Sequence, residues 1–507
     1  MICSRGRINI AENISYRDVV QVANCDAYEI YIDQESINRL RDIRYKFIEY
    51  IKSGGECYGV TTGLGAQISS RTFSEDVTNY YLKILRQHAA GIGDYLPRNI
   101  VRGAMLILAR QLSLGFSAAS PEVIEVLIEM INRNITPLVP RYGSLGASGD
   151  LAPMSYVALA IYGEGLVIDK QGKVRSSREV LGEEGVKIPR IDIKDPISLI
   201  NNTSMSLSIA SHDLYMAEKL LASLVIVASI SIEAMSSPLE PFSKDIYGAK
   251  KVRGIEIISE SIKRILENSS LERRSVLQDR YSFRTIPQVL GSLYDVINFS
   301  RRIINDEINS SSDNPLFNGV KCVSGGNFYG SYIVASIESM IPPLTQALAQ
   351  SERRIFSILD PSLSRGLPPF LTKGSDVGYM IAQYSAVALL NRISQLAYPS
   401  TVFTAPTSAS QEDHVSNSYN SALKLLEILD LGMNIVSIEY LVASKALLLR
   451  DYVDRSSRRV REYVEYIKDL VEENAWTKDL GSVIREARAR LEDIVEKEMW
   501  QGVLKIF

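Results

Sequence analysis

Hydrophobic positions are arranged differently in the two parts of the chain that meet near residue 204. The first part alternates short apolar stretches with glycine-rich loops, and between residues 99 and 117 its apolar residues recur as on one face of a helix. The second part contains three long stretches, at 205–235, 333–359 and 377–396, that are apolar on more than one helical face. Helices of that kind are usually buried.

This pattern predicts a mainly α protein with a long central helical bundle and a smaller, loop-rich N-terminal part. We expect two domains, residues 1–203 and residues 204–507, because the change of pattern falls between them. The stretch 456–500 is amphipathic and highly charged, which predicts outer helices with one face in water.

Composition and charge exclude two classes of partner. The chain has 507 residues, of which 46% are hydrophobic and 23% charged, as in an ordinary soluble protein. Its formal net charge is −3 and it has no long basic run, so we expect no nucleic-acid partner. The most apolar stretch, 220–232, is shorter than the roughly 18 residues of a membrane span, so we expect a buried helix and no membrane partner.

The four cysteines, Cys3, Cys25, Cys57 and Cys322, are scattered and form no CxxC pair. This spacing predicts neither a disulfide framework nor a zinc site, and it favours a cytoplasmic protein. Residues 1–15 contain no apolar stretch of the kind found in signal peptides. We expect no metal, because no pair of His, Cys, Asp or Glu stands at a ligand spacing with a third partner.

A glycine-rich stretch at 143–153 reads GSLGASGDLAP. It lacks the lysine of a phosphate-binding loop and the spacing of a dinucleotide-binding loop. A structural interpretation is a turn that enters a helix capped by Ser148 or Asp150.

The same stretch, extended to Ser155, resembles the signature of the histidine and phenylalanine ammonia-lyase family. In that family Ala-Ser-Gly cyclises and loses two waters to form 4-methylidene-imidazol-5-one (MIO), a strong electrophile. The resemblance implies that Ala147, Ser148 and Gly149 form this cofactor here. The Gly149 amide must attack the Ala147 carbonyl, which needs an unhindered nitrogen at a tight bend, and Ser148 must lose its hydroxyl.

Other motifs resemble those of the family in the expected order. The loop YGVTTGLG at 58–65 implies that Tyr58 removes the β-proton of the substrate, for which its phenol needs a nearby positive charge or hydrogen-bond donors. LINNT at 199–203 implies that Asn201 holds the cofactor carbonyl.

Three further motifs lie in the second part of the chain. In QDRYSFRTIPQ at 278–288, the resemblance implies site roles for Gln278 and Tyr281, and Arg284 suits bidentate recognition of a substrate carboxylate. SGGNFYG at 324–330 implies that Phe328 lies near the cofactor, and QEDHVS at 411–416 implies that Glu412 lies in the substrate pocket.

The substrate follows less directly from the sequence. Gln87-His88 stands at the position that selects the side chain in the family, where histidine enzymes typically read Ser-His. His88 and Glu412 can both hydrogen-bond an imidazole, and a phenyl ring would leave each polar group unpaired at a cost of about 1–3 kcal/mol. We therefore expect L-histidine, converted to trans-urocanate and ammonia.

Some positions favour other substrates. Thr61 stands where histidine enzymes usually have Asn and where phenylalanine and tyrosine enzymes usually have Thr, and Leu64 replaces a customary Phe. A tyrosine or phenylalanine ammonia-lyase, or a 2,3-aminomutase, is therefore the alternative. A non-catalytic homologue is a second alternative, which the intact Ala147-Ser148-Gly149 and Tyr58 disfavour.

The family resemblance also implies a homotetramer with active sites shared between chains, and a small amino acid as the partner. Two of the three histidines are expected to have structural roles: His212 as a core residue of a buried helix, and His414 as a residue that orders its loop by hydrogen bonding.

Overall fold

A computed structural model describes residues 5–69, 77–274, 276–372, 376–472, 478–500 and 506. Its contacts define two compact units: unit 1 contains residues 1–215, 301–337 and 399–423, and unit 2 contains the remainder. The prediction of domains that divide after residue 203 stays a prediction.

The helices of unit 1 are α1 (Tyr16–Asn24), α2 (Gln34–Lys52), α3 (Val77–His88), α4 (Arg98–Ser113), α5 (Pro121–Asn132), α6 (Ala152–Ile161), α7 (Ser177–Glu183) and α8 (Asp195–Ile200). The helices of unit 2 are α10 (Lys244–Lys250), α11 (Arg253–Ile265), α12 (Tyr281–Arg284), α15 (Pro361–Ser364), α16 (Met380–Leu396), α18 (Arg458–Glu465), α19 (Lys468–Glu472) and α20 (Leu480–Trp500). Four helices contribute residues to both units: α9 (Ser204–Ala234), α13 (Ile286–Ile308), α14 (Ser331–Leu359) and α17 (Ser418–Leu449). The described chain is thus mainly α, as predicted.

The strands are short and belong to unit 1. They are β1 (Gly6–Asn9), β2 (Tyr28–Tyr31), β3 (Ile92–Tyr95), β4 (Thr136–Pro137), β5 (Pro140–Tyr142), β6 (Leu166–Ile168), β7 (Val174–Ser176), β8 (Leu316–Phe317) and β9 (Cys322–Val323). The pair β1–β2 is parallel, and β3–β5, β4–β6–β7 and β8–β9 are antiparallel.

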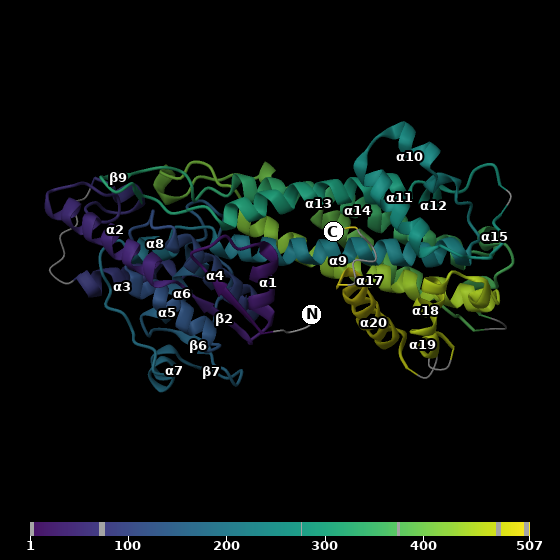
Figure 1. The fold of residues 1–507 in the computed structure, drawn as a ribbon, viewed down its shortest axis with the longest axis horizontal. Coiled ribbons are helices and arrows are strands. Elements are labelled where there is room, and N and C mark those ends of the chain that lie inside the picture. The colour runs from purple at the N-terminus through teal and green to yellow at the C-terminus, as the bar shows by residue number, and fades with distance from the viewer. Residues whose placement is uncertain are drawn as a thin grey trace. The chain divides into compact units, whose positions relative to one another are not determined.

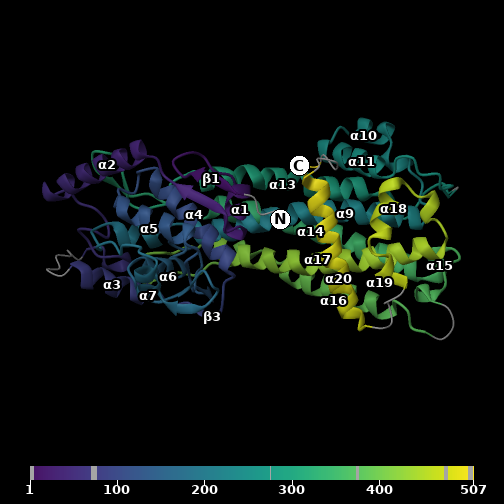
Figure 2. The same ribbon diagram turned by 60° about the horizontal axis from the view of Figure 1, so that its bottom comes forward.

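Unit 1 is a set of helices packed around α4. Within it α4 contacts α1 and α5, and α6 contacts α3 and α8 (Figure 2). The start of α1 is fixed by a capping box, in which Ser15 and Asp18 bind each other's backbone N–H groups. The predicted helix within 99–117 is α4, and nearly all of its side chains are buried.

The core of unit 2 is formed by parts of α9, α13, α14 and α17, which run side by side (Figure 1). Gly432 of α17 lets Leu348 of α14 and Leu220 of α9 approach so closely that an added Cβ would meet both within 3.1 Å. A buried bidentate ion pair between Arg354 and Glu439 joins α14 to α17. Residues 205–235 are buried over nearly their whole length, as predicted, whereas 333–359 is buried only in part, with Ala335, Pro342, Gln346 and Arg353 exposed.

Within the described residues, one segment, Asp195–Ala234, is long and apolar enough to cross a membrane by length and composition alone. Its most apolar window is 89% buried inside the protein, and residues 220–232 form part of this buried stretch. The predicted buried helix at 220–232 is therefore confirmed.

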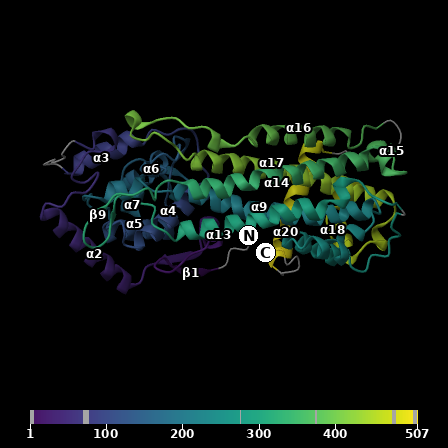
Figure 3. The same ribbon diagram turned by 90° about the horizontal axis from the view of Figure 1, so that it is seen from above.

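The expected burial of 377–396 is wrong for the single chain. Helix α16 buries only Ala382, Ala386 and Ile393, whereas Ile381 and Tyr384 are 49% and 63% exposed. The helix lies along one margin of the unit 2 helices, next to α17 (Figure 3), and the Arg392–Glu427 ion pair joins the two. The segment is helical, but its apolar face is left open by this chain.

The expectation of no disulfide is also wrong. Cys57 and Cys322 form a disulfide with a Cα–Cα distance of 5.4 Å, although 265 positions separate them in the sequence. Cys25 is disulfide-bonded as well. Sequence spacing reveals local motifs such as CxxC, but it does not reveal cysteines that only the tertiary fold brings together. The cysteines therefore no longer support the predicted cytoplasmic location, which stays a prediction.

Candidate active site

A cavity of about 590 Å³ in unit 1 brings together five of the predicted site residues: Tyr58, His88, Ser148, Asn201 and Glu412. We call it the site cavity. Its wall is completed by Leu64, Gly65, Gln67, Tyr80, Lys83, Ile84, Gln87, Leu151, Ile197, Ile200 and Ser408. Residues from five separate parts of the sequence thus meet at one place.

The Ala147-Ser148-Gly149 loop is pressed against the chain that follows α8. The Asp150 and Leu151 N–H groups donate to the carbonyls of Asn202 and Ile200, at 2.7 and 3.2 Å. Gly149 has a φ of +69°, and an added Cβ would lie 2.4 Å from the Asn202 carbonyl oxygen. Only glycine fits this position, as the required bend at the Gly149 nitrogen demands.

The simpler interpretation of this loop as a helix cap is not supported. Helix α6 begins after Leu151, and no side chain caps it. Asp150 instead accepts the Ser206 N–H at 2.9 Å, and burial raises the pKa of its carboxyl to about 6 against the opposing effect of that hydrogen bond. Leu151 has a φ of +41°, so the loop holds a strained backbone at the edge of the cavity.

Ser148 and Glu412 are in direct contact. The Ser148 hydroxyl donates to Glu412 Oε1 at 2.5 Å, and the Thr407 hydroxyl donates to Glu412 Oε2 at 2.7 Å. The backbones of Thr407 and Glu412 also form a β-bridge. The carboxylate is therefore held on both oxygens with one side toward the predicted cofactor loop.

Tyr58 is held by its own loop. The Gly65 N–H donates to the Tyr58 phenol oxygen at 2.7 Å. Such a donor stabilises negative charge on that oxygen, which a base requires. Gly59 and Gly65 both have positive φ angles, which glycine adopts without strain.

One face of α3 lines the site cavity through Tyr80, Lys83, Ile84, Gln87 and His88. The spacing is that of a single helical stripe. His88 Nδ1 lies 2.8 Å from the Ile84 carbonyl oxygen. With its proton on Nδ1 the ring donates to that carbonyl, which leaves Nε2 as an acceptor.

Asn201 follows α8 directly, is 6% exposed, and lines the site cavity. Its Oδ1 atom is buried without a hydrogen-bond partner among the described residues. The start of α8 is anchored by Lys194, whose ammonium donates to Asp313 at 2.6 Å and to Ser198 at 2.8 Å. A buried polar atom with no partner at a cavity wall indicates a place for a ligand or cofactor group.

Other predicted site residues lie elsewhere in the chain. Gln278 and Arg284 line a second cavity, of about 560 Å³, in unit 2. The Nε atom of Arg284 is buried and has no partner within the described part of the chain. Tyr281 is 69% exposed, and the Arg284 guanidinium lies over its ring. Phe328 is half-buried after β9 and lines neither cavity.

The remaining histidines have structural surroundings. His212 is buried in α9 and its Nδ1 lies 2.8 Å from the Ser208 carbonyl oxygen, and burial lowers the pKa of its ring to about 4. His414 is hydrogen-bonded to the Tyr329 hydroxyl, which ties its loop to the segment after β9. In the described ranges, no three His, Cys, Asp or Glu side chains are grouped as for a metal ion.

Sequence reasoning missed Thr407, which holds Glu412, and three residues of the α3 face, namely Tyr80, Lys83 and Ile84. Helical spacing counted back from His88 would have found the three on α3. No signal in the sequence pointed to Thr407, because its contact depends on a bridge between two loop residues.

Comparison with known proteins identifies the family. The model of the aromatic amino acid lyase family matches residues 14–469. A probable histidine ammonia-lyase of Thermoplasma acidophilum is 38% identical over 466 residues, which are 91% of this chain and 93% of that protein.

Solved structures agree with this assignment. The tyrosine aminomutase of Streptomyces globisporus superposes with a TM-score of 0.91 at 27% identity, over 98% of this chain and 99% of the other. The histidine ammonia-lyase of Trypanosoma cruzi gives 0.88 at 26% identity, over 98% and 95%. The fold and the match along the sequence define a carbon–nitrogen lyase. The chain belongs to the aromatic amino acid lyase family.

Proposed function

We propose that this enzyme eliminates ammonia from L-histidine to form trans-urocanate, using an MIO group made from Ala147, Ser148 and Gly149. The observation that carries the proposal is the site cavity, where the Ala147-Ser148-Gly149 loop, Tyr58, His88 and Glu412 meet. The relatives named as histidine ammonia-lyases support the choice of substrate.

The residues present fit the cofactor. Gly149 occupies a bend where no side chain fits, and the buried Asn201 Oδ1 lacks a partner beside it. Asn201 would hold the carbonyl of the group by donating from its amide nitrogen, which leaves the unpartnered Oδ1 to accept from the substrate amine. The Asp150 and Leu151 N–H groups, which donate to the carbonyls of Asn202 and Ile200, keep the loop in its bend. When formed, the group supplies an electrophile that turns the substrate amine into a better leaving group.

The chain's own residues supply the remaining chemistry. Tyr58 removes the β-proton, and the Gly65 N–H stabilises the negative charge on its oxygen. His88 offers Nε2 as an acceptor, because Ile84 occupies Nδ1. Glu412 is a second acceptor once the Ser148 hydroxyl has been lost, since Thr407 keeps the carboxylate in place. A neutral imidazole has one N–H and engages one of the two acceptors, whereas an imidazolium engages both.

Thr61, which stands where phenylalanine and tyrosine enzymes usually have Thr, has a structural role here. Its hydroxyl accepts the Cys57 N–H at 2.9 Å and donates to the Cys57 carbonyl at 3.2 Å. Thr61 is not part of the cavity wall. A tyrosine aminomutase remains the second candidate, because such an enzyme shares the fold at a TM-score of 0.91.

We also propose a homotetramer in which active sites are shared between chains. The open apolar face of α16 around Ile381 and Tyr384 supports an interface between subunits. Arg284 and Gln278 line a cavity of a different unit from the one that holds Ser148, and Arg284 would bind the substrate carboxylate in a neighbouring subunit's site. Mixed tetramers of Ser148→Ala and Arg284→Ala chains should then regain activity that neither variant has alone, and no gain would contradict the shared site.

The direct test of the proposal is Ser148→Ala, which removes the hydroxyl that the cofactor must lose. The intact mass of the wild-type chain should be lower by two waters than the sequence requires, and that of the variant should not. The variant should keep the helical circular dichroism spectrum and lose urocanate formation. Near-wild-type turnover in the variant would overturn the cofactor assignment.

A further inference from the structure

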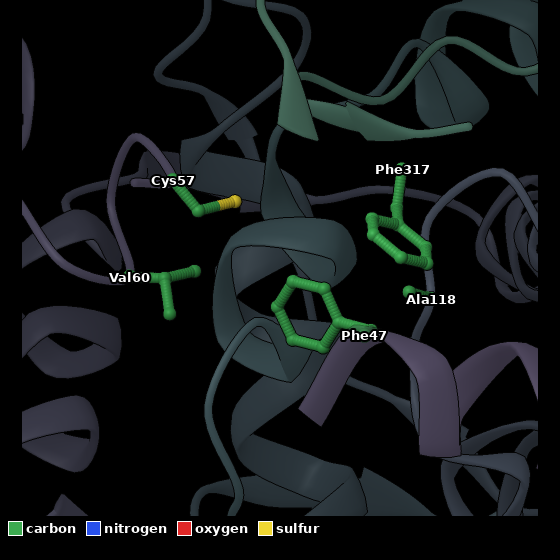
Figure 4. Packing of buried hydrophobic residues seen from close by; sticks show 5 residues of the cluster. All are labelled: Phe47, Cys57, Val60, Ala118 and Phe317. Carbon is green, nitrogen blue, oxygen red and sulfur yellow. The ribbon is translucent and has the colours of Figure 1, made fainter. Parts of the chain in front are cut away.

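Cys57, one end of the Cys57–Cys322 disulfide, directly precedes Tyr58, the base of the proposed reaction. Cys57 is 2% exposed and belongs to a cluster of buried residues with Phe47, Val60, Ala118 and Phe317 (Figure 4). Cys322 belongs to β9 and packs against the same cluster. The disulfide therefore connects residues 57–65, which we call the tyrosine loop, to a part of the core that is distant in sequence.

The partner side of this bond is firmly fixed. Strand β9 pairs with β8, and the Phe317 N–H of β8 donates to the Phe116 carbonyl at 2.7 Å. The Phe317 ring packs edge-on against Phe47 of α2, with 5.4 Å between the ring centroids. The β8–β9 hairpin thus attaches Cys57 to the buried cluster around Phe317.

The tyrosine loop is closed mainly on itself. The Val60 and Thr61 N–H groups donate to the Cys57 carbonyl, at 3.1 and 2.9 Å, and the Thr61 hydroxyl bonds both backbone groups of Cys57. The Gly65 N–H then reaches the Tyr58 oxygen. Since Cys57 is the residue to which these loop bonds converge, movement of Cys57 moves the Tyr58 side chain with it.

We infer that the Cys57–Cys322 disulfide is a positioning element for Tyr58, so that its reduction lowers the rate of proton removal while the enzyme stays folded. This inference rests on the proposed role of Tyr58. A general base acts within hydrogen-bond reach of its proton, and a displacement of about 1 Å costs up to about a hundredfold in rate. A two-electron reductant such as a phosphine cleaves the S–S bond to two thiols and becomes the phosphine oxide with oxygen from water.

Cys322→Ser is the suitable variant, because it breaks the bond without changing a residue of the tyrosine loop. Cys25→Ser is the matched control, because it removes a cysteine that is disulfide-bonded elsewhere, after α1, and does not line the site cavity. Both are assayed as the full chain with L-histidine at saturating and limiting concentrations, together with intact mass and circular dichroism.

The expected result is a fall in kcat of at least about tenfold for Cys322→Ser, with KM changed less than threefold, the two-water mass deficit kept, and Cys25→Ser unchanged. Phosphine treatment of Cys25→Ser should lower kcat to the same extent, and reoxidation should restore it. This treatment breaks the Cys57–Cys322 bond without a substitution at Cys322, so it tests the inference even if Cys322→Ser folds poorly. If kcat stays within twofold of the wild type while only the melting temperature falls, the disulfide is merely structural and the inference is wrong. An inactive wild-type enzyme would instead contradict the proposed function.

Discussion

Replacing Gly149 by alanine tests the geometry of the cofactor-forming loop. The new Cβ would lie 2.4 Å from the Asn202 carbonyl oxygen and 2.8 Å from the Asn202 backbone nitrogen and carbonyl carbon. An ordinary contact starts at 3.4 Å, so one of the two backbone segments must move by about 1 Å. The Asp150 and Leu151 hydrogen bonds to Asn202 and Ile200 hold the segments together and would be broken by that movement.

The energetic cost can be estimated from these contacts. A φ of +69° costs an L-residue about 1–2 kcal/mol, and two lost backbone hydrogen bonds cost about 0.5–1.5 kcal/mol each. The total for Gly149→Ala is about 2–5 kcal/mol. Gly185→Ala is the control. Gly185 has a φ of +70° with nothing within 4 Å of an added Cβ, so this substitution costs only the φ contribution.

The assay combines thermal unfolding with intact mass. Gly149→Ala should melt at a lower temperature than Gly185→Ala and should not lose the two waters, because its amide nitrogen is displaced from the Ala147 carbonyl. Gly185→Ala should mature fully. A Gly149→Ala chain that loses two waters as completely as the wild type would refute the geometric reasoning.

Three further predictions concern the site, the pH dependence and the assembly. Glu412→Gln should lower kcat/KM for L-histidine by about 10–150-fold, the value of a hydrogen bond to a charged group, and an unchanged kcat/KM would remove Glu412 from substrate recognition. Burial, and to a smaller extent the charge of Asp306, raises the pKa of the Glu307 carboxyl to about 7. The folded state therefore binds the carboxyl proton more tightly than the unfolded state does. The free energy of unfolding should fall by up to about 3 kcal/mol as the pH rises from about 4.5 to 7. Glu307→Gln should therefore raise the melting temperature at pH 8 and not at pH 4, and equal shifts at both pH values would contradict this. Ile381→Asp with Tyr384→Asp should dissociate the oligomer in light scattering and abolish activity, whereas a dissociated but active enzyme would disprove the shared sites.

The helices could be predicted from the sequence because their signal is local. Apolar residues that recur through 205–235 and 333–359 mark α9 and α14, whatever else the chain does. The same signal led to a wrong expectation of burial for α16, because an apolar pattern shows that a helix has an apolar face but not what covers that face. The disulfide escaped because its two cysteines meet only through the fold.

The sequence motifs identified candidate site residues, but they did not show which of these residues share a cavity. The fold brings Tyr58, Ser148 and Glu412 from distant segments to one cavity, where the Thr407–Glu412 bridge, a contact with no sequence signature, holds Glu412. Arg284 and Gln278 could be assigned a chemistry, but a single sequence gives no reason for them to line a separate cavity. In the proposed tetramer, residues of a neighbouring subunit would complete the site, and no local sequence pattern encodes contacts between subunits.

Product formation by the purified wild-type enzyme, with L-histidine, L-tyrosine and L-phenylalanine in parallel, tests the proposed reaction. We expect urocanate and equimolar ammonia from L-histidine and no unsaturated acid from the other two substrates. Coumarate or cinnamate without urocanate, or a β-amino acid in place of an unsaturated acid, would contradict it.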